Sequence, residues 1–87
     1  MTKTPLTPDW RDLVSRLLKS EMSKRKLKYD DLSHRLAEMG TEQTAANLRN
    51  KINRGILGAD LLLQLIIAME ISSIERESLL EILNTMD

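Results

Sequence analysis

The sequence predicts an all-α protein, a single compact domain of five helices. Apolar residues recur at helical spacing along nearly the whole chain, and no segment alternates as a strand does. Phe is absent and Gly occurs only three times, so little supports a sheet. A chain of 87 residues, 41% hydrophobic and 30% charged, has the composition of one soluble globular domain. We assign residues 1–7 to an N-terminal tail and residues 8–87 to the domain.

The first helix is predicted over residues 8–25. Thr7 is a suitable N-cap, Pro8 fits the first helical position, and Asp9 suits the positive first turn. Five residues at helical spacing form the expected inward stripe: Trp10, Leu13, Val14, Leu17 and Leu18. This helix should therefore contribute one broad apolar face to the core.

The second helix is predicted over residues 30–39 and the third over residues 42–54. Gly40 can take the left-handed conformation that ends the second helix, and Gly55 can end the third. Thr41 is the expected start of the third helix. The core-facing residues are predicted to be Leu32, Leu36 and Met39 in the second helix and Thr41, Ala45, Leu48 and Ile52 along the third.

The fourth and fifth helices are predicted over residues 60–70 and 73–86. The fourth is apolar on nearly every side, which is typical of a helix that the others surround. The fifth begins with a capping-box pattern, Ser72 to Glu75. A narrow apolar seam follows, made of Leu79, Ile82, Leu83 and Met86, and it either pairs two copies of the chain or closes the core of one.

Several classes of site are not expected from the composition. Without cysteine there is no disulfide or thiolate metal site, and the single histidine, His34, has no partner to share a metal with. No serine lies in a nucleophile elbow and no glycine-rich phosphate loop occurs, so we expect neither an enzyme nor a cofactor. The longest apolar stretch, residues 61–69, is far short of the ~20 residues of a membrane helix. We expect a cytoplasmic protein, since the N-terminus has no signal-peptide pattern.

Charge is distributed unevenly although the net charge is zero. Residues 1–55 hold 12 Lys and Arg against 7 Asp and Glu, whereas residues 56–87 hold one Arg against six acids. This asymmetry favours a basic working end and an acidic end that faces elsewhere. The alternative is that both halves merely carry solvated charged faces.

The third predicted helix carries the strongest functional pattern. Gln43, Asn47, Asn50 and Arg54 are spaced to lie along one exposed stripe that contains no acid. Asn and Gln can bond two edge atoms of adenine at once, and Arg can do the same with guanine. We therefore predict that these four residues read bases, although an ordinary solvated polar face remains the alternative.

The residues Leu32, Ser33, His34, Arg35 and Leu36, followed by Gly40, Leu48, Ile52, Arg54, Gly55 and the stretch 61–69, resemble the lambda-repressor-like (Cro-type) helix-turn-helix domain. The segment 47–55 is also similar to a small bacterial family of helix-turn-helix-like proteins without assigned function. The resemblance implies a five-helix fold whose third helix enters the major groove of DNA. One departure is the distance from Leu36 to Leu48, which is longer than the family pattern and indicates about one extra helical turn shared between the second and third helices.

The sequence thus predicts a sequence-specific DNA-binding protein, a small bacterial or phage-type transcriptional regulator. Its partner would be double-stranded DNA, bound by a homodimer that pairs through the seam of the fifth helix. Contacts to the DNA backbone are predicted for Lys24, Arg25, Lys26, Lys28, Arg35, Arg49 and Lys51. The alternative function is a protein–protein interaction module, an adaptor or antitoxin-like partner, that keeps the fold without binding DNA.

Overall fold

The computed structural model describes residues 9–86, which form five helices and no strand. The helices are α1 (Trp10–Arg25), α2 (Tyr29–Glu38), α3 (Ala45–Arg54), α4 (Ala59–Ala68) and α5 (Arg76–Asn84). The prediction of an all-α fold with five helices is confirmed. None of the helices in this part of the chain has the length and apolar character that crossing a membrane requires.

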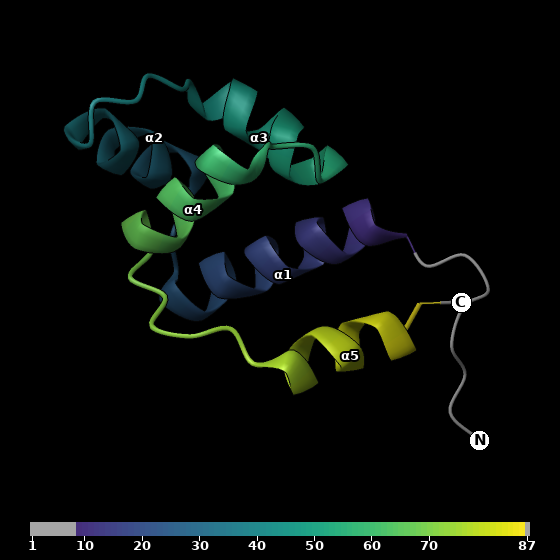
Figure 1. The fold of residues 1–87 in the computed structure, drawn as a ribbon. Helices are drawn as coiled ribbons and strands as arrows, with labels where there is room; N and C mark the ends of the chain where they lie inside the picture. The colour runs from purple at the N-terminus through teal and green to yellow at the C-terminus, as the bar shows by residue number, and fades with distance from the viewer. Residues whose placement is uncertain (1–8, 87) are drawn as a thin grey trace.

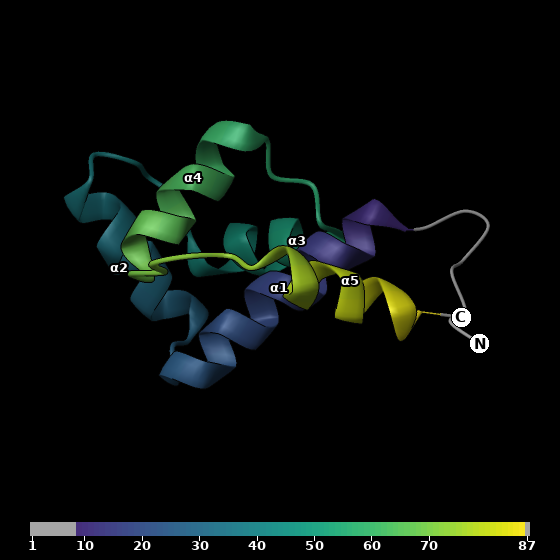
Figure 2. The same cartoon turned by 60° about the horizontal axis from the view of Figure 1, so that its bottom comes forward.

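The longest helix, α1, lies in the middle of the arrangement. It packs against α3 on one side and α5 on the other, while α2 packs against both α3 and α4 (Figures 1 and 2). Seven side chains are fully buried between these helices: Leu18, Leu32, Leu36, Leu48, Ile52, Leu65 and Met69. Within the α2–α3 pair, α3 is therefore supported by α1, and α2 is supported by α4.

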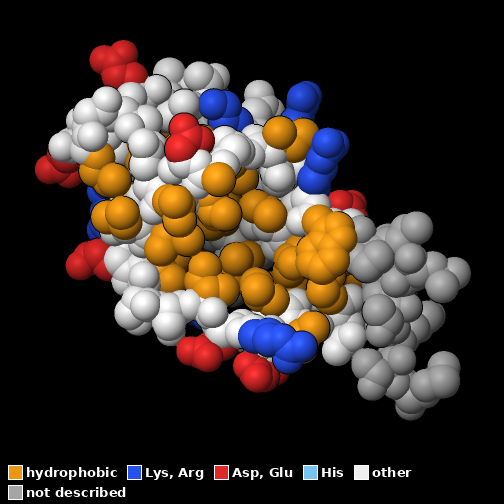
Figure 3. Space-filling view, in the orientation of Figure 1, with side chains coloured by type: hydrophobic (Ala, Val, Ile, Leu, Met, Phe, Trp, Pro, Cys, Tyr) orange, Lys and Arg blue, Asp and Glu red, His pale blue; other side chains and the backbone are white. Residues whose placement is uncertain are grey.

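The prediction that α4 is the helix surrounded by the others is wrong. Only one of its faces is buried, through Leu61, Leu65 and Ala68, which are spaced to lie on one side of the helix. Leu63 and Ile67 point away and are 60% and 66% exposed. Figure 3 shows hydrophobic side chains across the middle of one face of the molecule.

The start of α1 differs from the prediction. Asp9 is the N-cap, and its carboxylate accepts a hydrogen bond from the backbone N–H of Asp12 at 3.0 Å. The predicted cap and first helical residue, Thr7 and Pro8, lie outside the described residues. Trp10 is 60% exposed and does not belong to the buried stripe.

The additional helical turn predicted for the second and third helices is wrong, because the residues between α2 and α3 form a connection. Both helices have ten residues, and residues 39–44 join them. The N-cap of α3 is Thr44, whose hydroxyl accepts from the N–H of Asn47 at 3.0 Å, so the predicted start at Thr41 is wrong. Met39 is exposed, which corrects its place in the core, whereas Gly40 has the expected left-handed conformation.

The last helix begins later than the capping-box pattern predicts. Its N-cap is Glu75, and Ser72 does not cap it. The hydroxyl of Ser73 instead donates to Oε1 of Glu75 at 3.2 Å, so the serine–acid pair closes a turn ahead of the helix. Because α5 packs against α1, its apolar seam already has a role within one chain: Met86 is buried, and Leu79, Ile82 and Leu83 are half-buried.

Candidate nucleic-acid interface

The exposed face of α3 is the most distinctive polar surface of the described residues. The buried side of the helix is fixed by Leu48 and Ile52, which are both fully covered by α1 and α2. Successive residues of an α-helix are rotated by about 100°. Asn50 therefore points almost directly away from the core, and Asn47 and Arg54 lie beside it on the same exposed arc.

Two cations border this arc on opposite sides. Arg49 directly precedes Asn50 and Lys51 directly follows it, so their side chains project to the two flanks of Asn50. The guanidinium of Arg49 lies 5.6 Å from the centroid of the Tyr29 ring, a cation–π contact at the start of α2. The Nζ of Lys51 lies 3.3 Å from Oε1 of Gln43 on the other side. Contacts from neighbouring segments thus hold both cations toward the flanks.

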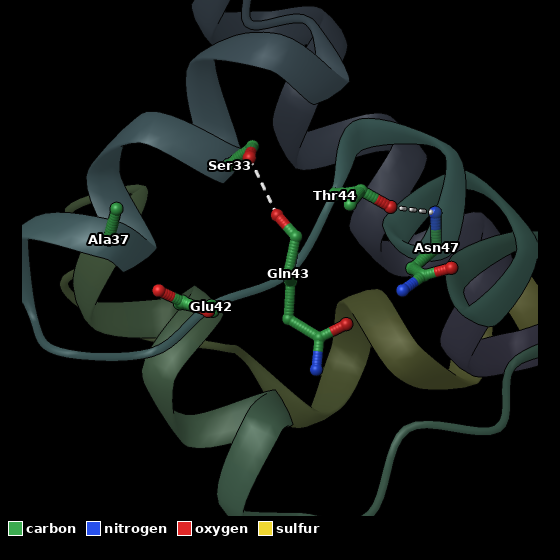
Figure 4. A pocket seen from close by; sticks show the side chains of 6 residues that line it. All are labelled: Ser33, Ala37, Glu42, Gln43, Thr44 and Asn47. Carbon is green, nitrogen blue, oxygen red and sulfur yellow. Dashed lines mark hydrogen bonds between the residues drawn. The ribbon is translucent and has the colours of Figure 1, made fainter.

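The side chain of Gln43 does not belong to the exposed arc, which corrects its predicted place on the third helix. It lies in the connection before α3, half-buried, at a pocket of about 350 Å³ that Ser33 and Asn47 also line (Figure 4). Its backbone carbonyl accepts a hydrogen bond from the Ser33 hydroxyl at 2.6 Å (Figure 4). Gln43 is thereby fixed to α2 by its backbone and to Lys51 by its side chain.

A second depression lies on the opposite flank of α3. It has a volume of about 380 Å³, and its lining includes Lys28, Tyr29 and Arg49. Lys28 is the N-cap residue of α2, and its backbone N–H donates to Oδ2 of Asp31 at 2.8 Å. Asp31 therefore closes the first turn of α2, while the Lys28 side chain stays exposed on the same flank as Arg49.

Besides Arg49 and Lys51, three more of the predicted backbone-contacting cations have partners within the protein. Lys24 and Arg25 form ion pairs with Glu21, at 3.3 Å and 2.6 Å. Arg35 donates to the backbone carbonyl of Ala68 at 2.8 Å and so ties α2 to the end of α4. The ion pairs of Lys24 and Arg25 join residues three and four apart in α1, so sequence spacing could indicate them. The contact of Arg35 joins residues far apart in the chain, so spacing could not. Lys26, in the left-handed C-cap of α1, is exposed.

Glu21 is a buried carboxylate that depends on these pairs. Burial alone would raise its pKa, but hydrogen bonds and charge from Arg25 and Lys24 outweigh that effect and hold the pKa below its ordinary value of 4.5. Glu21 therefore stays ionised at neutral pH and neutralises charge at the end of α1. The net positive charge at the C-terminal end of α1 is therefore smaller than the run of cations in the sequence suggests.

Two residues of the arc, Ala46 and Asn53, are not among the predicted site residues. Asn53 is exposed and lies near Asn50, at a spacing of three residues. Ala46, Asn50 and Asn53 have the i, i+4, i+7 spacing that marks one face, so the signal was present in the sequence. The arc thus carries three asparagines, one alanine and a terminal arginine, and α3 contains no acidic residue.

Nowhere within residues 9–86 do three or more His, Asp or Glu side chains gather as a metal site would require. The first pocket beside α3 is lined by amides and hydroxyls together with Ala37 and the acid Glu42. The second is lined by the cations Lys28 and Arg49 together with Asp30 and mainly apolar side chains.

Comparison with known proteins gives one match. A family model described as a domain of unknown function matches residues 10–74, which is most of the chain and includes α1 to α4. No curated protein and no solved structure matches the chain.

Proposed function

The chain belongs to this family, DUF6471, and we propose that it is a sequence-specific DNA-binding protein in which α3 enters the major groove. The observation that carries the proposal is the arrangement around Asn50: short amide side chains face outward, with Arg49 and Lys51 on the two flanks. We further propose that the fold is of the Cro-type helix-turn-helix class with a lengthened connection between α2 and α3.

The dimensions of α3 suit this role. An α-helix with its side chains is about 10–12 Å across, and the major groove of B-DNA is about 12 Å wide. A helix lying in the groove has base edges in front of it and a phosphate backbone on each side. The outward amides of Asn47 and Asn50 would then meet base edges, and Arg49 and Lys51 would each meet one phosphate backbone.

Further cations lie where they can support the same contact. Lys28 is exposed beside Arg49, and Arg54 lies at the end of α3. Glu77 and Glu81 lie on α5 and Glu75 is its N-cap. This helix packs against the opposite side of α1 from α3 (Figure 1). This separation supports a protein that presents its basic surface to DNA and keeps its acidic surface away. As a regulator of transcription, it would act through the DNA segment that α3 occupies.

A salt titration of DNA binding tests the proposal. Measured by fluorescence anisotropy with a labelled duplex, the affinity should fall steeply as the salt concentration rises. The reason is that the Lys and Arg side chains of the bound protein release counterions from the DNA phosphates. Lys51→Ala should lower the slope of log affinity against log salt by about one unit and weaken binding to all sequences alike.

The matched control is Arg76→Ala. Like Lys51, Arg76 carries one positive charge, but it is exposed at the start of α5, away from the proposed interface. We expect its replacement to leave the slope unchanged. Equal effects of the two variants, or no binding at low salt, would refute the proposal.

The second candidate function is a protein–protein interaction module, favoured by the outward face of α4. Leu63 and Ile67 are one turn apart and more than half exposed, so they are neighbours on one apolar surface, and contiguous apolar surfaces mark interaction sites. The same face offers a surface for a homodimer, which remains part of the main proposal. Pairing through α5 has less support, since its seam is already partly covered by α1.

A further inference from the structure

The outward arc of α3 has a composition that bears on which base pairs it can recognise. Its central residues are short and uncharged: Ala46, Asn47, Asn50 and Asn53 are all exposed. The long cationic side chains Arg49 and Lys51 lie on the flanks and not in the centre. Short side chains bring a helix close to the surface that it contacts, so these groups would lie directly against the base edges.

Each base pair presents a different set of groups in the major groove. Adenine offers an acceptor and a donor that match the two ends of an asparagine amide, and thymine offers a methyl group that packs against alanine. Guanine offers two acceptors and is read by Arg or Lys, while cytosine offers a donor and is read by Asp or Glu. The centre of the arc has the amides and the methyl group but neither a cation nor an acid.

The flanking contacts keep the cations out of the centre. The Arg49 guanidinium is held by the Tyr29 ring, and the Lys51 ammonium by Gln43. Among residues 9–86 no such contact is made by Arg54, which lies at the last position of α3. A residue able to read guanine is therefore available at one end of the arc, while the middle is limited to amides.

We propose that α3 recognises a core of adenine–thymine pairs, read chiefly by Asn50 with Asn47 and Asn53, and bordered at one end by a guanine that Arg54 contacts. This inference rests on the proposed DNA binding and adds the base composition of the target. Asn50 is its central residue, because it projects furthest from the buried side of the helix.

Selection of bound duplexes from a random pool, followed by sequencing, tests the inference. We expect enriched sites to share a core of A·T pairs, and replacing the central pair with G·C to weaken binding by roughly 5- to 150-fold. Enriched sites with a G·C core would overturn the inference and leave DNA binding intact. A pool that shows no enrichment over its starting composition would overturn both.

A change of specificity gives the second arm. Asn50→Arg places a guanine-reading side chain at the centre of the arc and should shift the preference at one position from A·T to G·C. Asn50 is exposed, so the variant should fold, which its helical circular dichroism and melting temperature will verify. Ser78→Ala on α5 is the control, and its selected sites should equal those of the unaltered protein. If Asn50→Arg selects the same core as the unaltered protein, Asn50 does not read a base and the inference fails.

Discussion

Gly55 meets two requirements at the end of α3. Its φ is +66°, a conformation that costs L residues about 1–2 kcal/mol, and a Cβ there would overlap the backbone carbonyl of Arg11 in α1. Gly40 has a similar φ of +84°, but nothing lies within 4 Å of the place where its Cβ would be. We expect Gly55→Ala to reduce the free energy of unfolding clearly more than Gly40→Ala, as measured by urea denaturation. Equal reductions would contradict the close packing of α1 on the end of α3.

The Glu21 carboxylate predicts a pH dependence of stability. Because its pKa is lowered in the folded protein, its contribution is fully present above the unfolded value of 4.5 and is lost as the pH falls through the folded value. We expect Glu21→Gln to be less stable than the unaltered protein at pH 7, with the difference shrinking below pH 4.5. Urea denaturation at a series of pH values measures this, and a constant difference down to pH 3 would count against the ion pairs.

At the scale of elements, the connection between α2 and α3 sets where α3 begins. The Ser33 hydroxyl holds the carbonyl of Gln43 at 2.6 Å, and Thr44 then caps the helix. We expect Ser33→Ala to lower the free energy of unfolding by about 1 kcal/mol and to speed hydrogen exchange of the first α3 amides. Exchange rates unchanged at these amides would show that the bond does not position the helix. Ser20→Ala, an exposed site on α1, is the control.

The features of the fold that depend on residues close together in the chain could be predicted from the sequence. The number of helices, the buried residues Leu48 and Ile52, and the exposed arc of Asn47, Asn50 and Arg54 all follow from helical spacing. The start of α3 could not be predicted, because Thr41 and Thr44 are both good N-caps and the bond from Ser33 distinguishes them. Gln43 was therefore placed on the helix although it lies before it.

Long-range contacts account for the remaining differences. The partner of Arg35 is the carbonyl of Ala68, 33 residues away, so its structural role has no local signal. In α4 the buried face could not be distinguished, because apolar residues on every side give no amphipathic pattern. The exposure of Leu63 and Ile67 depends on which helices pack against α4, and only the fold shows this.

At the scale of the whole molecule, the two apolar surfaces of α4 and α5 should respond differently to a charge. Leu83 is half-buried on the helix that packs against α1, whereas Ile67 is 66% exposed. We expect Leu83→Asp to lower the free energy of unfolding by at least about 2 kcal/mol and Ile67→Asp to change it by less than about 0.5 kcal/mol. Urea denaturation compares them. The reverse order would show that the α5 seam is free to pair with another chain.

Sedimentation of the same two variants extends the comparison to the oligomer. If two copies pair through α4, Ile67→Asp should be a folded monomer under conditions where the unaltered protein is a dimer. A dimer that survives Ile67→Asp would exclude the outward face of α4 as the pairing surface. This experiment also distinguishes the two uses of the α4 face. A dimer that Ile67→Asp dissociates indicates a homodimer, whereas an unaltered protein that sediments as a monomer leaves this face for a different protein.

The central claim is that the outward face of α3 is the surface that meets DNA, and mapping of amide NMR signals during titration with duplex DNA tests it most directly. The account predicts that the largest shifts occur at Asn47, Arg49, Asn50 and Lys51, with smaller shifts at the start of α2 and none on α5. Shifts centred on Leu63 and Ile67 of α4, or no shifts at all at low salt, would contradict it.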